Sequence, residues 1–180
     1  TYHPVTLENN TVEEQFLNLL KVLDRNPKIR MIFTKANADT NGRIVNELID
    51  KYAAQNSERA CAFMSLGQKR YLSALKYCRI VIGNSSSGII EAPSFGKPII
   101  NIGDRQKGRI CADSVINCGY TQQEIQQAME TALTKEFENK ASNCRNPYEK
   151  ENTAANIISV IKDYLLNDKI KLKKGFYDIK

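Results

Sequence analysis

Two short apolar segments on either side of a serine- and glycine-rich loop constrain the fold of this chain more than any other feature. Residues 80–82 are Ile-Val-Ile, and residues 99–102 are Ile-Ile-Asn-Ile. Short runs of β-branched residues are typical of parallel strands that are covered on both faces. The sequence therefore predicts two buried strands here, joined by the loop and a short helix.

The loop at residues 83–88 is Gly-Asn-Ser-Ser-Ser-Gly. Backbone N–H groups of small residues can approach a ligand closely, and serine hydroxyls can donate hydrogen bonds. The apolar residues from Ile89 onward predict the start of a helix, with Glu91 in its first turn and Pro93 near its end. A loop at a helix N-terminus favours a phosphate ligand, although an ordinary structural turn explains the same sequence equally well.

A polar loop with three cations follows the second predicted strand, at Arg105, Lys107 and Arg109. Arginine side chains bind phosphate and carboxylate groups with a forked geometry. These cations favour an anionic ligand over a purely structural turn, although Lys107 is equally compatible with a solvated position.

Strands and helices alternate along the rest of the chain, which predicts an α/β fold with a Rossmann-like, doubly wound parallel sheet. We expect one domain over residues 1–180. Ligands bind at the carboxyl ends of the strands in such sheets, so several loops are expected to open at one edge. The expected helices cover residues 11–25, 42–55, 68–77, 121–134 and 153–166. The other expected strands cover residues 29–33, 60–64 and 115–117. Residues 135–150 are expected to be irregular.

The composition excludes several classes of protein. With 42% hydrophobic and 26% charged residues, the chain is globular rather than disordered. Its net charge of +6 comes partly from lysines after residue 168, and no aromatic and basic recognition motif accompanies them, so we expect no nucleic-acid binding. No apolar run is long enough to cross a membrane. The five cysteines have no CxxC spacing, which favours reduced thiols in a cytoplasmic protein over a zinc site.

Two further residues are candidates for chemistry. His3 is the only histidine, and a lone histidine at a strand end is often structural, but its place at the expected ligand edge makes it a candidate catalytic group. Glu91 either complements a helix dipole or accepts hydrogen bonds from the hydroxyls of a ribose. No GxGxxG, Walker, HExxH or GxSxG motif occurs in the sequence, so nothing supports NAD binding, P-loop hydrolysis or serine-hydrolase chemistry.

Four motifs together resemble the UDP-N-acetylglucosamine 2-epimerases, specifically the hydrolysing branch that begins sialic acid biosynthesis. They are TYHPVT from Thr1, ANADTNG from Ala36, GNSSSGIIEAPSFGKPIINIG from Gly83 and DRQKGR from Asp104. The hydrolysing branch is indicated by TYHP and GDRQKGR, where non-hydrolysing relatives typically carry GHRREN and a TERPE-like segment. The resemblance covers essentially the whole chain as the carboxyl-terminal half of the enzyme.

This resemblance implies a glycosyltransferase-B-like architecture, in which two Rossmann-like domains hold the nucleotide sugar between them. The chain resembles the nucleotide-binding half, and the amino-terminal domain is absent from it. The resemblance also implies roles for residues at matching motif positions. These are His3 at the active centre, Asn37 and Arg105 along the UDP and sugar-phosphate cleft, Leu66 beside the uracil, Ser85 and Ser86 on the diphosphate, and Glu91 on the ribose.

The implied reaction converts UDP-N-acetylglucosamine to UDP and N-acetylmannosamine, by elimination to 2-acetamidoglucal and addition of water. The resemblance implies no metal or redox cofactor, a homo-oligomer when full length, and a cytoplasmic location. Because the residues that transfer the C2 proton are implied to lie in the absent half, we expect the isolated chain to bind UDP without turnover.

Three alternatives remain open on the sequence alone. The chain is also compatible with half of a non-hydrolysing epimerase, with half of a glycosyltransferase of the B type, or with a noncatalytic nucleotide-sugar-binding module. The sugar is either N-acetylglucosamine or a relative of the diacetylated bacillosamine type.

Overall fold

A computed structural model describes residues 1–5, 11–37, 41–167, 169–170 and 173. The chain divides into two compact units, Thr1–Pro147 and Tyr148–Lys180. The expectation of a single domain over residues 1–180 stays a prediction.

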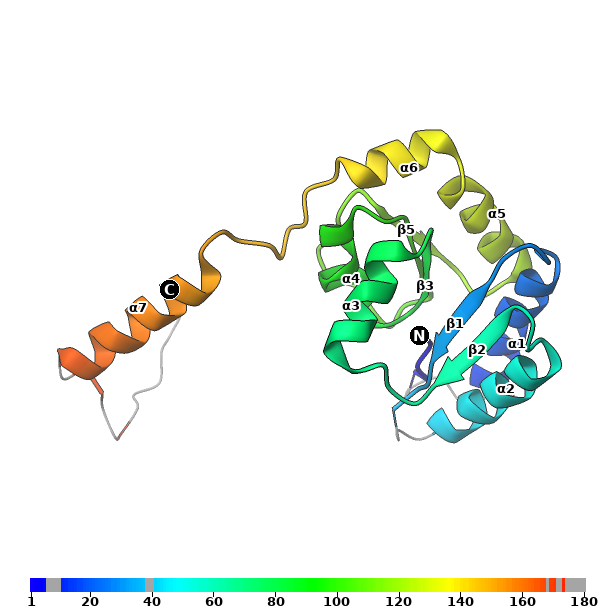
Figure 1. Ribbon diagram of the computed structural model, residues 1–180, viewed down its shortest axis with the longest axis horizontal. Coiled ribbons are helices and arrows are strands. Elements are labelled where there is room, and N and C mark those ends of the chain that lie inside the picture. The colour runs from blue at the N-terminus through cyan, green and yellow to red at the C-terminus, as the bar shows by residue number, and fades with distance from the viewer. Residues whose placement is uncertain (6–10, 38–40, 168, 171–172, 174–180) are drawn as a thin grey trace. The chain divides into compact units, whose positions relative to one another are not determined.

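All described strands of the first unit run parallel, in two hydrogen-bonded sheets (Figure 1). Parallel strands require crossover connections. Helices lie in two of the three connections within the sheets, and residues 103–114, which join the last two strands, contain no helix. This confirms the predicted α/β class, with the difference that the strands form a pair and a triplet instead of one continuous sheet. The pair is β1 (Met31–Thr34) with β2 (Ala60–Phe63), and the triplet is β3 (Val81–Gly83), β4 (Ile99–Ile102) and β5 (Val115–Cys118) in that order.

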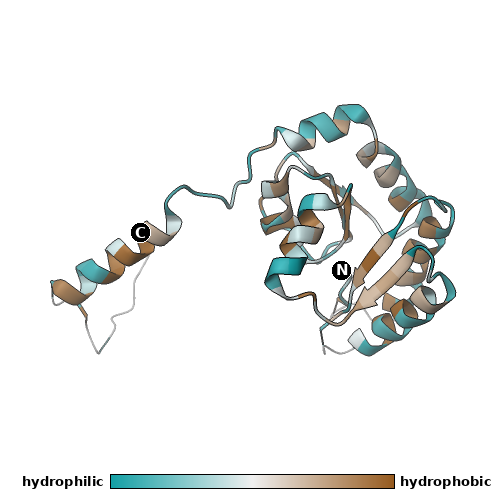
Figure 2. Ribbon diagram, viewed as in Figure 1, coloured by the Kyte–Doolittle hydropathy of each residue, from teal (hydrophilic) through white to brown (hydrophobic). Residues whose placement is uncertain are grey.

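The helices of the first unit have bounds close to those predicted, with α2 matching the expected range. Apolar residues at intervals of three and four positions give α1 and α2 one buried face each. In Figure 2, the ribbon of β1 carries the colour of hydrophobic residues. The helices are α1 (Val12–Asp24), α2 (Gly42–Gln55), α3 (Gly67–Tyr77), α4 (Ser86–Ile90), the 3-10 helix η1 (Ala92–Phe95), α5 (Gln122–Ala132) and α6 (Lys135–Ser142).

Successive residues of β4 point to opposite faces of its sheet, and a separate apolar cluster covers each face. Ile100 and Ile102 belong to the larger core with Phe16 of α1 and Met129 of α5. Ile99 packs on the other face, in a smaller cluster that includes Leu75 of α3. The triplet of strands is therefore covered on both sides, as its β-branched sequence predicts.

The expectation of an irregular segment over residues 135–150 is wrong for its first part, because α6 covers Lys135–Ser142. The helix starts at Thr134, whose hydroxyl accepts a hydrogen bond from the Phe137 N–H at 3.2 Å. Glu136 and Glu138 then lie in its first turn, where acidic side chains are favourable. Few apolar residues mark this helix, so its cap was the only strong signal for it in the sequence.

The helix after the serine loop begins three residues earlier than the predicted Ile89. Ser85 is its N-cap, and Ser86 is the first helical residue. As a result, Glu91 follows the last residue of α4 instead of lying in its first turn. The prediction that Glu91 lies in the first turn of this helix is therefore wrong, and Glu91 is instead the N-cap residue of η1.

The second unit contains α7 (Thr153–Leu166), which has the predicted bounds. Its apolar residues are exposed within this unit, with Ile161 at 51% and Leu166 at 80%. No helix among the described residues is long and apolar enough to cross a membrane.

Removing the N-terminal cap of α5 tests how much this cap contributes to the free energy of unfolding. Thr121 and Glu124 form a capping box, in which the Thr121 N–H donates to the Glu124 carboxylate at 3.1 Å and the Glu124 N–H donates to the Thr121 hydroxyl at 3.3 Å. We expect Thr121→Ala to lower the free energy of unfolding by about 1 kcal/mol, measured by urea denaturation. Thr131→Ala, which alters an exposed threonine within the same helix, is the control and is expected to change it by less than about 0.5 kcal/mol. Equal effects of the two substitutions would contradict the role of the cap.

Candidate functional site

Asn84 directly follows β3 and holds the amino-terminal segment in place. Its side chain is fully buried, at 0% exposure. The His3 N–H donates to Asn84 Oδ1 at 2.7 Å, and Asn84 Nδ2 donates to the His3 carbonyl oxygen at 2.7 Å. One amide side chain thus satisfies both backbone groups of His3 and fixes the backbone that carries the imidazole.

The backbone carbonyl of Asn84 holds a third segment, the loop that follows β4. It accepts hydrogen bonds from Arg105 Nη1 at 3.0 Å and from Gln106 Nε2 at 2.8 Å. Asn84 therefore joins the His3 segment, the serine loop and the arginine loop at the carboxyl ends of the strands. We call this set of contacts among His3, Asn84, Arg105 and Gln106 the Asn84 network.

A fourth loop reaches His3 from the end of β1. The Asn37 N–H donates to His3 Nδ1 at 3.5 Å, and the His3 side chain is only 6% exposed. A neutral imidazole that accepts at Nδ1 carries its proton on Nε2. This geometry therefore favours the tautomer in which Nε2 is a hydrogen-bond donor.

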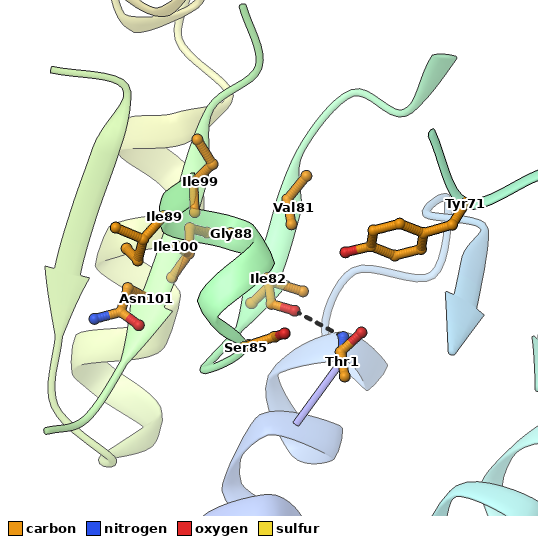
Figure 3. A pocket seen from close by; sticks show the side chains of 11 residues that line it. Thr1, Tyr71, Val81, Ile82, Ser85, Gly88, Ile89, Ile99, Ile100 and Asn101 are labelled. Carbon is orange, nitrogen blue, oxygen red and sulfur yellow. Dashed lines mark hydrogen bonds between the residues drawn. The ribbon is translucent and has the colours of Figure 1, made fainter. Parts of the chain in front are cut away.

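The serine loop caps helix α4 and also lines a small cavity. The Ser85 hydroxyl accepts the Ser87 N–H at 3.4 Å and so caps α4. Ser85 also lines a small cavity of about 20 Å³ between β3, β4 and α4, together with Thr1 and Asn101 (Figure 3). Ser86 is half-buried at the first position of the helix, where backbone N–H groups have no partner within the helix.

Tyr71 lies close to the serine loop and to Glu91. Its hydroxyl donates to Ser87 Oγ at 2.6 Å, and its pKa is raised, first by burial and also by the nearby Glu91 carboxylate. Glu91 itself is exposed. Leu66, at the start of α3, lines the same groove as Tyr71.

Two polar residues of this site were not singled out from the sequence, Asn84 and Gln106. Both are buried, and Gln106 Oε1 has no hydrogen-bond partner among the described residues. A signal for Asn84 was its place directly after a buried strand, and Gln106 lies among the cations of DRQKGR. Among those cations, Lys107 and Arg109 are exposed and only Arg105 bonds to the network.

The cysteines and acidic residues give no sign of a metal site in the described part of the chain. All five cysteines are free thiols. No group of three or more histidine, cysteine, aspartate or glutamate residues among the described positions could hold a metal ion.

Comparison with known proteins identifies the family. The sequence profile of the UDP-N-acetylglucosamine 2-epimerase family matches residues 1–162. The chain belongs to this family. The family assignment agrees with the resemblance carried by the four sequence motifs.

Curated relatives extend beyond the region that this chain matches. A Campylobacter jejuni protein named GDP/UDP-N,N'-diacetylbacillosamine 2-epimerase (hydrolyzing) is 46% identical over 137 residues, which are 76% of this chain and 35% of that protein. The Escherichia coli polysialic acid biosynthesis protein P7 is 36% identical over 99% of this chain and 45% of its own length. The chain thus spans less than half of the length of these relatives.

Solved structures of UDP-N-acetylglucosamine 2-epimerases share the fold. An S. aureus MnaA–UDP structure has a TM-score of 0.68 at 19% identity and is matched over 97% of this chain and 47% of its own. A Methanocaldococcus jannaschii enzyme in complex with UDP-GlcNAc and UDP has a TM-score of 0.66 at 18% identity, over 89% and 44%. The chain therefore has the fold of one half of a glycosyltransferase-B-like architecture.

Substitution of Asn84 tests whether its amide organises the site. We expect Asn84→Ala to lower the free energy of unfolding by about 2–4 kcal/mol, because it leaves the two buried backbone groups of His3 without their partner. Chemical denaturation followed by circular dichroism measures this effect. Asn143→Ala, which removes one exposed amide bond to the Asn139 carbonyl, is the matched control and should change stability by less than about 1 kcal/mol. A loss for Asn84→Ala no larger than for the control would contradict the organising role.

Proposed function

We propose that this chain is the UDP-binding half of a hydrolysing nucleotide-sugar 2-epimerase. The observation that carries this proposal is the Asn84 network, in which one buried residue joins the three segments that the family resemblance assigns to the active centre and the diphosphate. A ligand held by these segments would contact a histidine, serine hydroxyls and a guanidinium together.

The diphosphate is proposed to bind at Ser85, Ser86 and Arg105. The Ser86 N–H and the Ser86 hydroxyl are proposed as donors, and Arg105 supplies a positive charge that is already positioned by its bond to Asn84. Donors fixed before the reaction stabilise developing negative charge without reorganisation. Asn37 is proposed to line the same cleft, next to His3.

The nucleoside is proposed to lie toward Tyr71, with Glu91 on the ribose and Leu66 beside the uracil. An exposed carboxylate can accept hydrogen bonds from both hydroxyls of a ribose. The Tyr71 hydroxyl bonds to Ser87 within the serine loop, so it links the proposed nucleoside side of the site to the diphosphate side.

The proposed reaction begins with anti elimination of UDP. The C2 proton leaves, the C1–O bond breaks toward the β-phosphate, and 2-acetamidoglucal forms. Water then adds across the double bond and releases N-acetylmannosamine. His3 is the catalytic residue that we propose on this chain, because a proton on Nε2 can be donated to the departing phosphate oxygen. The groups that transfer the C2 proton are proposed to lie in an amino-terminal half, so this chain alone is expected to be inactive.

The hydrolysing branch is supported by the motifs TYHP and GDRQKGR and by the names of two relatives. The Campylobacter jejuni relative and a Legionella pneumophila relative, 32% identical over 98% of this chain, are both named as hydrolysing diacetylbacillosamine 2-epimerases. These names also make a diacetylated sugar a candidate substrate. We further propose that the full-length enzyme is a homo-oligomer in the cytoplasm, as the resemblance implies.

Titration with UDP tests the proposed site directly. We expect the chain to bind UDP. The substitution Ser86→Ala should weaken binding about 3- to 10-fold by loss of one hydrogen bond, and Glu91→Ala should weaken it about 10-fold or more. Isothermal titration calorimetry measures both. The controls are Ser73→Ala and Glu130→Ala, which alter exposed residues of the same types on α3 and α5. If all four variants bind UDP as tightly as the parent chain, the assignment of the site is wrong.

Analysis of the reaction product tests the branch. A full-length enzyme that contains this chain, incubated with UDP-N-acetylglucosamine or with the UDP form of the diacetylated sugar, is expected to release UDP and the free 2-epimeric sugar. Chromatography of the products with nuclear magnetic resonance of the sugar distinguishes the outcomes. Accumulation of the UDP-linked epimer would show a non-hydrolysing enzyme, and acceptor-dependent release of UDP would show a glycosyltransferase.

A further inference from the structure

The loop that reaches His3 from the end of β1 is held along one row of helix α2. Its residues 35–37 contact Asp50, Asn46 and Gly42 in that order. Positions four apart in a helix lie above one another on the same face. The three contacts therefore form one continuous line between the loop and α2, which lies beside β2 in Figure 1.

Asn46 holds both backbone groups of the middle residue of this loop. The Ala36 N–H donates to Asn46 Oδ1 at 2.7 Å, and Asn46 Nδ2 donates to the Ala36 carbonyl oxygen at 3.2 Å. Ala36 is only 4% exposed, so water does not readily replace these bonds. The same pair of bonds joins Asn84 to the backbone of His3. Two asparagine amides thus hold the backbone on both sides of the contact between Asn37 and His3.

Gly42 lets the next residue of the loop lie directly against the helix. A Cβ atom at Gly42 would lie 2.2 Å from the Asn37 carbonyl oxygen, closer than any real side-chain carbon approaches. Gly42 is also buried, as the first residue of α2. The Asn37 backbone therefore occupies the space that a side chain at this position would need.

The third contact contributes less to the position of the loop. Lys35 Nζ lies 2.6 Å from Asp50 Oδ2, but the Asp50 side chain is 56% exposed. Ion pairs that are open to water add little to stability. We therefore assign the placement of the loop to Asn46 and Gly42.

The bond that depends on this placement runs from the Asn37 N–H to His3 Nδ1. At 3.5 Å it is longer than most hydrogen bonds, and the hydrogen bonds of catalytic groups often tighten only when substrate is bound. A displacement of Asn37 away from the ring would remove it. Because the partner of one imidazole nitrogen decides which nitrogen carries the proton, the position of the loop controls the tautomer of His3.

We propose that Asn46 is a positioning residue for His3. By holding Ala36, it places the Asn37 N–H on Nδ1 and keeps the imidazole in the tautomer with its proton on Nε2. Gly42 assists by leaving room for the Asn37 carbonyl. The catalytic consequence rests on the proposed function, in which His3 donates this proton to the departing phosphate oxygen.

Nitrogen-15 nuclear magnetic resonance of the imidazole tests the positioning role without any substrate. His3 is the only histidine in the sequence, so labelled histidine gives a single pair of ring-nitrogen resonances. The spectra are recorded well above the ordinary imidazole pKa of about 6.5. A single tautomer then gives two widely separated resonances, and exchange between tautomers moves them toward each other. We expect a wide separation with Nε2 protonated in the parent chain, and a smaller separation in Asn46→Ala.

Gly42→Ala displaces the same loop by a second route. The added Cβ atom forces the Asn37 carbonyl to move, while α2 loses no intrinsic stability, because alanine is a better helix former than glycine. We expect the separation of the two resonances to fall in this variant as well. Asn56→Ala is the matched control, since it removes a half-buried amide bond to the Tyr52 carbonyl at the other end of α2 and is expected to leave the separation unchanged.

An unchanged separation in folded Asn46→Ala overturns the proposal. If Asn46→Ala does not fold, Gly42→Ala decides in the same way. An equal change in Asn56→Ala also overturns the proposal, because the change would then come from general loosening of the first unit.

Kinetics of a full-length enzyme that contains this chain separate this proposal from the proposed function. General acids contribute about 10²- to 10⁴-fold to the rate, so partial misplacement in Asn46→Ala is expected to lower kcat about 10-fold and to change KM less than about twofold. Asn56→Ala is expected to leave both nearly unchanged. His3→Gln is the reference variant.

The reference variant makes the two failures distinguishable. If His3→Gln lowers kcat and Asn46→Ala does not, the positioning role is overturned while the proposed function stands. If His3→Gln leaves kcat unchanged, the proposed catalytic role of His3 is wrong, and the nitrogen resonances alone decide whether Asn46 positions the ring.

Discussion

The paired hydrogen bonds between the Asn84 side chain and the His3 backbone are the interaction on which the site depends. Both bonds are 2.7 Å long and the amide is fully buried, so water cannot replace them when they are broken. The carbonyl of the same residue also holds Arg105 and Gln106. A single residue after a buried strand therefore sets the relative positions of a candidate catalytic imidazole and a guanidinium.

The rigidity of this arrangement comes from the strands behind it. Ile99 and Ile100 bury opposite faces of β4 in two different apolar clusters, so β3 and β4 cannot shift without disturbing both clusters. The serine loop and the arginine loop leave the carboxyl ends of these two strands. Thr1 links the pair β1 and β2 to these strands through its bonds to Ile82, Asn84 and Thr34. Met31 and Phe33 of β1 also share the larger apolar core with β4.

Much of the fold followed from the sequence because its signals are local. Apolar runs, caps and periodic stripes predicted the strands, α2 and the capping box at Thr121. The helix α6 was missed because it has few apolar residues, and the start of α4 was misplaced because Ser85 caps a helix that begins with serines. The sequence also predicted that the loops holding His3, Ser86 and Arg105 meet at one edge, but the role of Asn84 depends on contacts between residues 81 positions apart, which no local pattern encodes.

We propose that the serine loop and the arginine loop, which Asn84 joins, bind the diphosphate of a nucleotide. Amide chemical shifts of the isotopically labelled chain, followed during titration with UDP and separately with uridine, test it most directly. We expect UDP to perturb the amides of Ser85, Ser86 and Arg105 and uridine to leave them nearly unchanged. Equal shifts with both ligands, or shifts confined to residues outside the serine and arginine loops, would contradict it.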